Sequence, residues 1–183
     1  MKKDNLFYYI LGLFAGDGWF EKRGIAIATS KYREALRISE DLESLFDKKP
    51  KIKKRTYPDK HVIYKVAVYS VNIEKVFREL LGNVKRNKSK TFTLPKFSNR
   101  NLARCFVKGI FDAESYTYKW KGQPRIAFEI YNEKASKHIY QILKEDLVCS
   151  LSKRSNGGFR IDITGTKNTE KYHAYYVSAL YRE

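Results

Sequence analysis

A ten-residue segment that occurs twice constrains the fold of this chain more than any other feature. Residues 9–18 read YILGLFAGDG, and residues 106–115 read FVKGIFDAES. Both segments keep the same order of apolar residues, small residues and a final carboxylate, and the similarity continues into the segments that follow. Internal similarity of this kind indicates a chain built from two related halves.

Each half is expected to repeat one order of elements, which is helix, two strands, helix, two strands, helix. In the first half we predict helices over 6–15, 32–46 and 72–81, and strands over 19–23, 25–30, 51–57 and 62–69. In the second half we predict helices over 101–113, 133–147 and after 168, and strands over 116–120, 125–131, 149–154 and 159–164. The fold class is therefore α+β, with two pseudo-symmetric αββαββα halves at 1–94 and 101–183, joined by a connector at 95–100.

Small residues stand four positions apart in each copy of the segment, Gly12 with Gly16 and Gly109 with Ala113. Residues four apart share one face of a helix. Glycine within a helix costs about 1 kcal/mol relative to alanine, so a close approach of backbones is the expected compensation. The two first helices should therefore pack face to face and in parallel at a short distance.

Two carboxylates, Asp17 and Glu114, directly follow these small-residue faces. A helix C-terminus carries partial negative charge, and two carboxylates there repel each other, so a cation would remove the conflict. Mg²⁺ fits best because it accepts carboxylate, carbonyl, water and phosphate oxygens together. Such an ion can activate water for phosphodiester hydrolysis. The alternative is that both residues are solvated acids at helix ends.

The charge of the chain indicates a nucleic-acid partner. Lys and Arg number 37 against 20 Asp and Glu, for a net charge of +17, while 43% of residues are hydrophobic, as in a folded protein. The basic residues are spread over the whole chain, which argues against a membrane partner. Cys105 and Cys149 form no CxxC pair, so no thiolate metal site is expected. Lacking a long apolar run and a cleavage pattern, the chain is expected to be intracellular and cytoplasmic.

The repeated segments resemble the motif of the LAGLIDADG homing endonucleases, which aligns with residues 10–18 and 107–115. Two copies in one chain are similar to the single-chain, pseudo-dimeric branch of that family. The resemblance implies a saddle of antiparallel sheets astride double-stranded DNA, and a monomer that cuts a long non-palindromic target. It also implies Mg²⁺ as cofactor, with Ca²⁺ or Mn²⁺ able to substitute for binding or cutting. An intron-encoded protein is expected, because Met1 directly precedes the first helix and no intein splice residues flank the motifs.

The same resemblance implies roles for particular residues. Asp17 and Glu114 would be catalytic metal ligands, and the backbone carbonyls of Gly16 and Ala113 would be further ligands. Lys31, after Ser30 at the end of the second strand, resembles a basic residue that family members keep near the reactive water and phosphate, as do Lys88 and Lys90. The alternative for each lysine is a solvated charge that positions phosphate. The chain departs from the motif at three positions, which are Ala15 in place of the first acid, Lys108 in place of a small residue and Ser115 in place of the final glycine.

Period-two alternation over residues 125–131 and 159–164 predicts strands with one buried face and one polar face. A polar sheet face on a basic protein can read base edges, with Arg for guanine and Asp or Glu for cytosine, although an ordinary solvated face is the alternative. The basic run over residues 51–55 is expected to position phosphate. The predicted DNA-binding residues are Ser30, Lys51, Lys53, Arg55, Lys65, Lys119, Arg125, Glu129, Tyr131, Arg160 and Asp162.

The two predicted reading strands differ, since Gly24 aligns with Arg125 and Ala28 with Glu129. A non-palindromic target follows from this difference. Two other functions remain open on the same scaffold, an RNA splicing maturase and a DNA-binding regulator whose metal chemistry has lapsed. The presence of both motif acids favours the active enzyme over the regulator, because binding alone gains little from carboxylates that face phosphates.

Overall fold

The computed structural model describes residues 2–82 and 88–174 of the chain. The first half contains α1 (Asn5–Asp17), β1 (Gly18–Glu21), β2 (Gly24–Thr29), α2 (Tyr32–Phe46), β3 (Lys51–Thr56), β4 (Val62–Tyr69) and α3 (Val71–Leu81). A short helix, α4 (Lys88–Thr91), precedes the second half. That half contains α5 (Arg100–Glu114), β5 (Ser115–Trp120), β6 (Gln123–Ile130), α6 (Glu133–Lys144), β7 (Cys149–Lys153), β8 (Phe159–Thr164) and α7 (Thr166–Tyr172). The predicted αββαββα order of both halves is confirmed.

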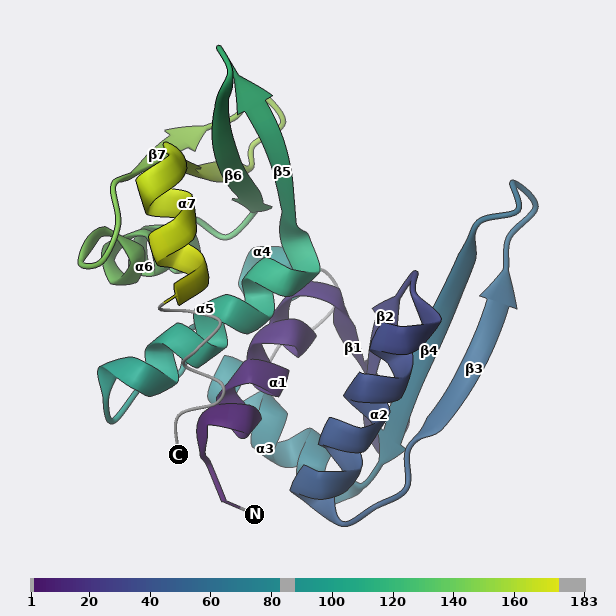
Figure 1. The fold of residues 1–183 in the computed structure, drawn as a ribbon. Helices are drawn as coiled ribbons and strands as arrows, with labels where there is room; N and C mark the ends of the chain where they lie inside the picture. The colour runs from purple at the N-terminus through teal and green to yellow at the C-terminus, as the bar shows by residue number, and fades with distance from the viewer. Residues whose placement is uncertain (1, 83–87, 175–183) are drawn as a thin grey trace.

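Each half forms one four-stranded antiparallel sheet. The strand orders are β1-β2-β4-β3 and β5-β6-β8-β7, so the two sheets have the same topology. The sheets stand on either side of the α1 and α5 pair, and the β3–β4 and β5–β6 hairpins extend away from it in the same general direction (Figure 1). This arrangement agrees with the saddle of antiparallel sheets expected from the sequence.

Side-chain caps explain where several helices begin. Asp4 accepts a hydrogen bond from the Phe7 amide at the start of α1, and Asn99 accepts one from the Leu102 amide at the start of α5. Such caps satisfy amides that have no partner within the helix. The connector expected at 95–100 therefore ends where Asn99 caps α5.

Two predicted helix boundaries were wrong by about three residues, and one short helix was missed. Helix α6 ends at Lys144 instead of residue 147, because Asp146 lies beyond the helix and is held by Arg100 at 2.6 Å and Arg104 at 2.7 Å. Helix α7 begins at Thr166, before residue 168, and α4 was not predicted. The ion pairs of Asp146 fix the end of α6 against α5, which the sequence pattern did not reveal.

The contact between α1 and α5 is close because it is made through backbone atoms. A Cβ added to Gly12 would lie 2.1 Å from the Phe106 carbonyl oxygen, and one added to Gly109 would lie 2.1 Å from the Tyr9 carbonyl oxygen. One turn later, a Cβ on Gly16 would lie 2.4 Å from the Ala113 Cβ. The predicted parallel, face-to-face packing is confirmed, and it brings the C-terminal ends of both helices together.

One hydrophobic core extends across both halves. Side chains of α1 and α5 are buried between the inner faces of the two sheets, where Ile25 and Val66 belong to the first sheet and Ile126 and Ile161 to the second. The opposite face of each sheet is therefore left for polar and aromatic side chains. Among the helices described, none has the length and apolar character needed to cross a membrane.

Substitution of Gly12 or Gly109 by alanine is predicted to destabilise the protein by about 2 kcal/mol, even though alanine favours a helix by about 1 kcal/mol. The new methyl group would overlap a backbone carbonyl, which cannot move without separating the helices. Denaturant unfolding measures the difference. Gly158→Ala is the control, because a Cβ there would meet only side-chain atoms, at 3.1 Å or more. Equal stabilities for the Gly12 variant and this control would contradict the close-packed interface.

Candidate functional site

The two motif acids occupy equivalent positions at the ends of the paired helices. Asp17 is the last residue of α1 and Glu114 is the last residue of α5, and both are exposed. The next residues, Gly18 and Ser115, have extended backbone with φ of −96° and −87°, so the chain passes from each helix directly into a strand. Each carboxylate therefore lies at a junction between a helix and a sheet.

Two cavities flank this junction and combine residues of both halves. One, of about 350 Å³, is lined by Asp17 of the first motif and Ala113 of the second, and we call it the Asp17 cavity. The other, of about 210 Å³, is lined by Gly16 of the first motif and Glu114 of the second, and we call it the Glu114 cavity. Each cavity is therefore lined by the acid of one half together with the small residue of the other half.

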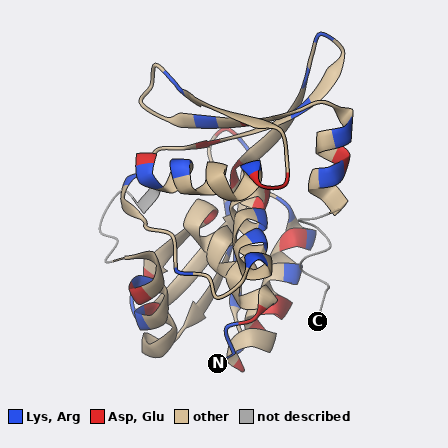
Figure 2. Ribbon diagram, turned by 90° about the vertical axis from the view of Figure 1, so that its left-hand side faces the viewer, with Lys and Arg blue, Asp and Glu red and all other residues tan. Residues whose placement is uncertain are grey.

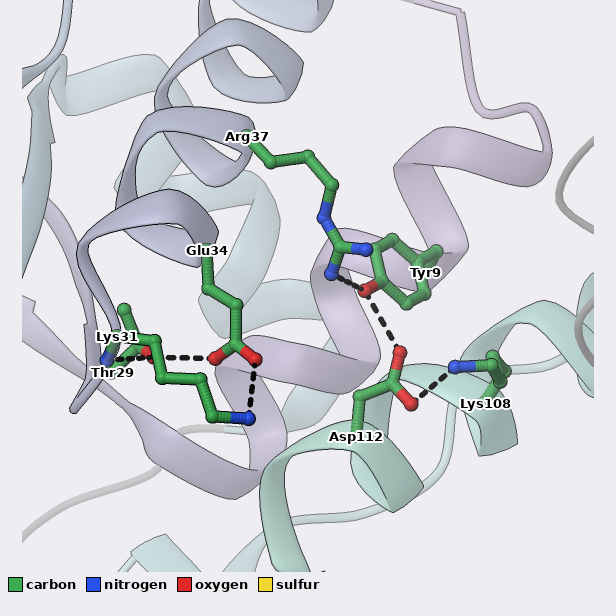
Figure 3. Close-up of polar contacts among 7 residues, drawn as sticks. All are labelled: Tyr9, Thr29, Lys31, Glu34, Arg37, Lys108 and Asp112. Carbon is green, nitrogen blue, oxygen red and sulfur yellow. Dashed lines mark hydrogen bonds and ion pairs between the residues drawn. The ribbon is translucent and has the colours of Figure 1, made fainter.

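Lys31 lies in the Asp17 cavity, where its position is set by neighbouring polar groups. Its Nζ is 3.1 Å from Glu34 Oε1, and Thr29 Oγ1 donates a hydrogen bond of 2.7 Å to Glu34 Oε2 (Figure 3). Burial raises the pKa of Glu34, but the hydrogen bonds from Thr29 and Lys31 outweigh burial and hold the pKa below its ordinary value. The structure thus brings one predicted catalytic lysine to the cavity of a motif acid.

A second polar network lies beside the same cavity and joins α1, α2 and α5 (Figure 3). The Tyr9 hydroxyl donates to Asp112 Oδ2 at 3.0 Å and accepts from Arg37 Nη2 at 2.7 Å, while Lys108 pairs with Asp112 Oδ1. Burial, followed by the charge of Asp112, raises the pKa of Tyr9 far above its ordinary value, so the phenol stays protonated. These contacts fix the α1–α5 pair against α2.

This network explains two of the departures from the motif. Asp112 is the equivalent of Ala15, and its carboxylate contacts Lys108 and Tyr9. Lys108, which replaces a small residue, is buried and forms the ion pair. The residue at the first acid position of the second half therefore holds helices together, and its equivalent in the first half is the buried Ala15.

The Glu114 cavity is also lined by Glu129, Tyr131 and Phe92. Asn132 donates hydrogen bonds of 2.9 Å to the carbonyl oxygens of Lys90 and Phe92, which ties the end of α4 to this half. Lys90 is exposed, and it stands two residues before Phe92, which lines the cavity. Lys88 begins α4, but its side chain lies outside the described part of the structure.

The open face of the first sheet carries the predicted phosphate-binding residues. Cross-strand pairing of Lys51 with Ala67, Lys53 with Lys65, and Arg55 with Ile63 places these side chains on the face opposite the core. Lys54 pairs with Tyr64 and lies on the other face, so the basic run is divided between two faces. Lys65 also contacts Glu21 at 2.7 Å, and this hydrogen bond raises the pKa of Lys65.

The open face of the second sheet carries Arg125, Glu129, Arg160 and Asp162, as their cross-strand pairing shows. The predicted alternation of β8 is confirmed, since Phe159, Ile161 and Ile163 are buried. Arg160 and Asp162 are paired with each other at 2.7 Å, and Glu129 lies 3.6 Å from Arg154. Arg160, Asp162 and Glu129, which were predicted to read bases, therefore already form ion pairs within the protein.

One predicted DNA-binding residue, Lys119, lies on the face of the second sheet opposite the other predicted residues. Lys119 pairs with Pro124, and the neighbouring pair joins Tyr118 to Arg125. Successive side chains of a strand point to opposite faces. Lys119 therefore lies on the side of the buried Ile126 and away from Arg125. The charge of Lys119 is visible in the sequence, but its face is set by the register of β5 with β6.

Sequence reasoning also missed the aromatic side chains of the open faces. Trp19 is 38% exposed on β1, and Tyr116 and Trp120 are 43% and 54% exposed on β5. The alternation of Tyr116, Tyr118 and Trp120 along β5 was the signal that could have revealed them. Ala127, which lies on the same face, is nevertheless fully buried, since it sits between Tyr116 and Asp162 in neighbouring strands.

Charge on the molecule is widely distributed, with Lys and Arg on both extended hairpins as well as on helices (Figure 2). The part of the chain that the structure describes contains no group of three or more His, Cys, Asp and Glu side chains placed to hold a metal. A metal at the helix ends would therefore rely on two carboxylates, backbone carbonyls, water and substrate. Mg²⁺ is commonly bound in proteins by one or two carboxylates together with water and phosphate.

The carboxyl group of Asp41, on α2 near the Tyr9 network, gives a prediction on stability. Burial raises the pKa of Asp41 from 3.8 to about 6, with Arg37 opposing and Glu40 adding to the rise. Because the Asp41 carboxyl is protonated more readily in the folded protein than in the unfolded chain, its protonation stabilises the fold. This stabilisation is fully present below about pH 4 and is lost as the pH rises through 6. Asp41→Asn should therefore stabilise the protein at pH 8 by up to about 3 kcal/mol, and this gain should disappear near pH 4.

Unfolding of this variant by urea at pH 4 and pH 8 tests the prediction, with the exposed Glu43→Gln on the same helix as control. A gain from Asp41→Asn that is equal at both pH values would contradict it.

Comparison with known proteins agrees with this geometry. Residues 4–82 match the model of the LAGLIDADG-like domain family. A sequence search of curated proteins gave no match. Among solved structures, full-length DUF199/WhiA from Thermatoga maritima has a TM-score of 0.69 at 14% identity, and the alignment covers 96% of this chain and 56% of that one. The chain thus spans little more than half of that protein.

Two structures with DNA are also similar. I-DmoI in complex with DNA and Mn has a TM-score of 0.65 at 16% identity, with 97% of this chain and 98% of that chain covered. The homing endonuclease I-WcaI, bound to its DNA recognition sequence, has a TM-score of 0.62 at 12% identity, with 97% and 82% covered. Residues 4–82 of this chain thus match a LAGLIDADG-like domain, and the chain as a whole has the single-chain, pseudo-dimeric LAGLIDADG fold.

Proposed function

We propose that the protein is a site-specific endonuclease that hydrolyses both strands of duplex DNA with Mg²⁺. The observation that carries the proposal is the pair of cavities, in each of which the acid of one motif meets the small residue of the other. The fold is common to homing endonucleases and to DUF199/WhiA, so the fold alone does not decide the activity. The composition of the site favours the nuclease.

The residues at the helix ends fit a divalent cation. Asp17 and Glu114 would supply carboxylate oxygens, and Gly16 and Ala113 would supply backbone carbonyls from the last turns of their helices. A Cβ on Gly16 would lie 3.7 Å from Glu114 Oε1, so this carboxylate is next to the Gly16 backbone. We propose one site formed by Asp17 with Ala113, and a second formed by Glu114 with Gly16.

The protein's own groups would then act around the phosphate. Bound Mg²⁺ supplies an activated water and stabilises charge on the phosphate oxygens. Asp17 and Glu114 would hold the two ions at the ends of α1 and α5. Lys31, held by Glu34 in the Asp17 cavity, can donate to a phosphate oxygen and so offset its developing charge. Its ion pair with Glu34 orients the ammonium before DNA arrives.

Recognition is proposed to use the open faces of both sheets. The first sheet presents Lys51, Lys53 and Arg55, which suit phosphates, and the second presents Arg125 and Arg160, which suit base edges. Because the two faces differ and one chain supplies both acids, we propose a monomer that binds a long, non-palindromic target.

Asp17→Asn and Glu114→Gln are each predicted to reduce Mg²⁺-dependent cutting by at least about 100-fold while leaving binding within about tenfold. Each change removes one carboxylate charge at the helix ends but leaves the open faces unchanged. Duplexes are first selected by binding from a randomised library in Ca²⁺, and cutting of the selected duplex is then timed in Mg²⁺.

Glu170→Gln, an exposed acid on α7, is the matched control and should cut at the parent rate. Parent-like cutting by either motif variant would show that the missing carboxylate is not a metal ligand. Tight, selective binding by a parent chain that never cuts would favour a DNA-binding regulator on this fold.

Lys53→Gln is predicted to lower the slope of log affinity against log salt concentration by about one, since one phosphate contact is lost. Lys54→Gln is the neighbouring control, because Lys54 lies on the opposite face of β3 and should leave the slope unchanged. The slope is measured with the selected duplex between low and moderate NaCl. Equal slopes for the two variants would contradict the assignment of the open face of the first sheet to DNA.

A further inference from the structure

We infer that Arg160 forms a preorganised binding site for a guanine base, with Asp162 and Tyr118 fixing the direction of its guanidinium. The inference rests on the proposed binding of duplex DNA, but it does not depend on cutting. It also changes the role expected for Asp162, from a reader of cytosine to a residue that positions Arg160.

Arg160 is held on three sides. Its Nε and Nη2 donate to Asp162 Oδ1 at 3.1 and 2.7 Å. Its Cζ lies 4.8 Å from the centre of the Tyr118 ring and 5.5 Å from the centre of the Tyr116 ring. The two rings are themselves in contact, with centres 5.9 Å apart. The guanidinium therefore rests on an aromatic surface with one edge bound to a carboxylate.

The edge that Asp162 occupies leaves the other edge for a ligand. A guanidinium has five N–H donors in one plane, and the hydrogen bonds described use one from Nε and one from Nη2. The edge formed by Nη1 and Nη2 can still present two parallel donors. Guanine offers the matching pair of acceptors, O6 and N7, in the major groove. Adenine and the pyrimidines do not offer two adjacent acceptors there.

Asp162 is poorly placed to read a base by itself. Its Oδ1 accepts both bonds from Arg160 and a third, of 2.6 Å, from the Tyr118 hydroxyl. The side chains of Arg160 and Asp162 are only 15% and 13% exposed. A change of partner for Asp162 would break these contacts, whereas a ligand bound at the Nη1–Nη2 edge of Arg160 would break none of them.

The restraint on Arg160 also favours affinity. A free arginine loses much rotamer freedom when it binds, and a side chain that is fixed beforehand loses less. The ion pair of the first sheet, Lys65 with Glu21, cannot act in the same way, because an ammonium lacks the planar pair of donors. This preorganised readout of guanine is therefore assigned to the half-site bound by the second sheet.

Site selection with a chain that binds but is not expected to cut, Asp17→Asn, tests the inference. This Asp17→Asn chain is the parent. The duplexes that it retains in Ca²⁺ are sequenced and compared with those retained by chains that carry Asp17→Asn together with a second substitution in the Arg160 cluster. Arg160→Lys keeps the charge but loses the two-donor edge, and it should reduce the preference for guanine at one base pair by roughly 5- to 100-fold. Arg160→Gln should shift the preference at the same base pair toward adenine.

Asp162→Asn should weaken the same guanine preference while raising overall affinity, because a negative charge near DNA is removed. Glu133→Gln is the control of equal charge, since Glu133 pairs with Lys137 on α6, and it should leave every preference unchanged. Tyr118→Phe keeps the ring and removes one hydrogen bond to Asp162, so it should give a smaller loss at the same base pair. Circular dichroism establishes that each variant is folded.

The outcomes separate the inference from the proposed function. Effects of Arg160→Lys and Asp162→Asn at different base pairs would show that Asp162 reads a base directly and would overturn the inference. Unchanged preferences in both would overturn it as well, while a parent that selects a defined sequence keeps the proposed function. A parent that selects no sequence would refute the proposed function, and the inference would fall with it.

Discussion

The backbone contact between α1 and α5 is the constraint on which the rest of this structure depends. Gly12 and Gly109 allow each helix to touch a carbonyl of the other, and no larger residue fits without separating the helices. Because the helices run in parallel, their C-terminal ends meet, and each leads directly into the first strand of its own sheet. The same contact therefore sets the positions of the two acids and of the two sheets that flank them.

The two halves share this framework but differ in the side chains placed on it. The Asp17 cavity contains Lys31 and Glu34 and borders the Tyr9–Asp112–Lys108 network, whereas the Glu114 cavity contains Glu129 and Tyr131. The open faces differ in the same manner, since the first sheet carries Lys51, Lys53 and Arg55, and the second carries Arg125 beside Trp120 and Arg160 beside Tyr118. A symmetric dimer could not maintain such differences. They are the physical basis for proposing that the halves make unequal contributions to DNA recognition.

Much of the fold could be predicted from the sequence, because the repeated segment and the strand alternation are local patterns. The helix at 32–46 and the strands at 62–69 and 159–164 were predicted at their observed bounds. What failed depends on contacts between distant segments. The face of Lys119 follows from cross-strand register, the end of α6 follows from ion pairs of Asp146 with α5, and the hydrogen bond that Asp162 accepts from Tyr118 comes from β5. Asp17 and Glu114 could be identified from the sequence as a pair. The cavity beside each of them could not be predicted, because it forms only when the two helices pack together.

The central claim is that each metal site is shared between the halves, and anomalous scattering from crystals grown with Mn²⁺ and the selected duplex tests it most directly. The account predicts two Mn²⁺ positions at the ends of α1 and α5, one bound by the Asp17 carboxylate and the Ala113 carbonyl, and the other bound by the Glu114 carboxylate and the Gly16 carbonyl. Manganese bound by an acid and a carbonyl of the same half, or no manganese at the helix ends with DNA in place, would contradict it.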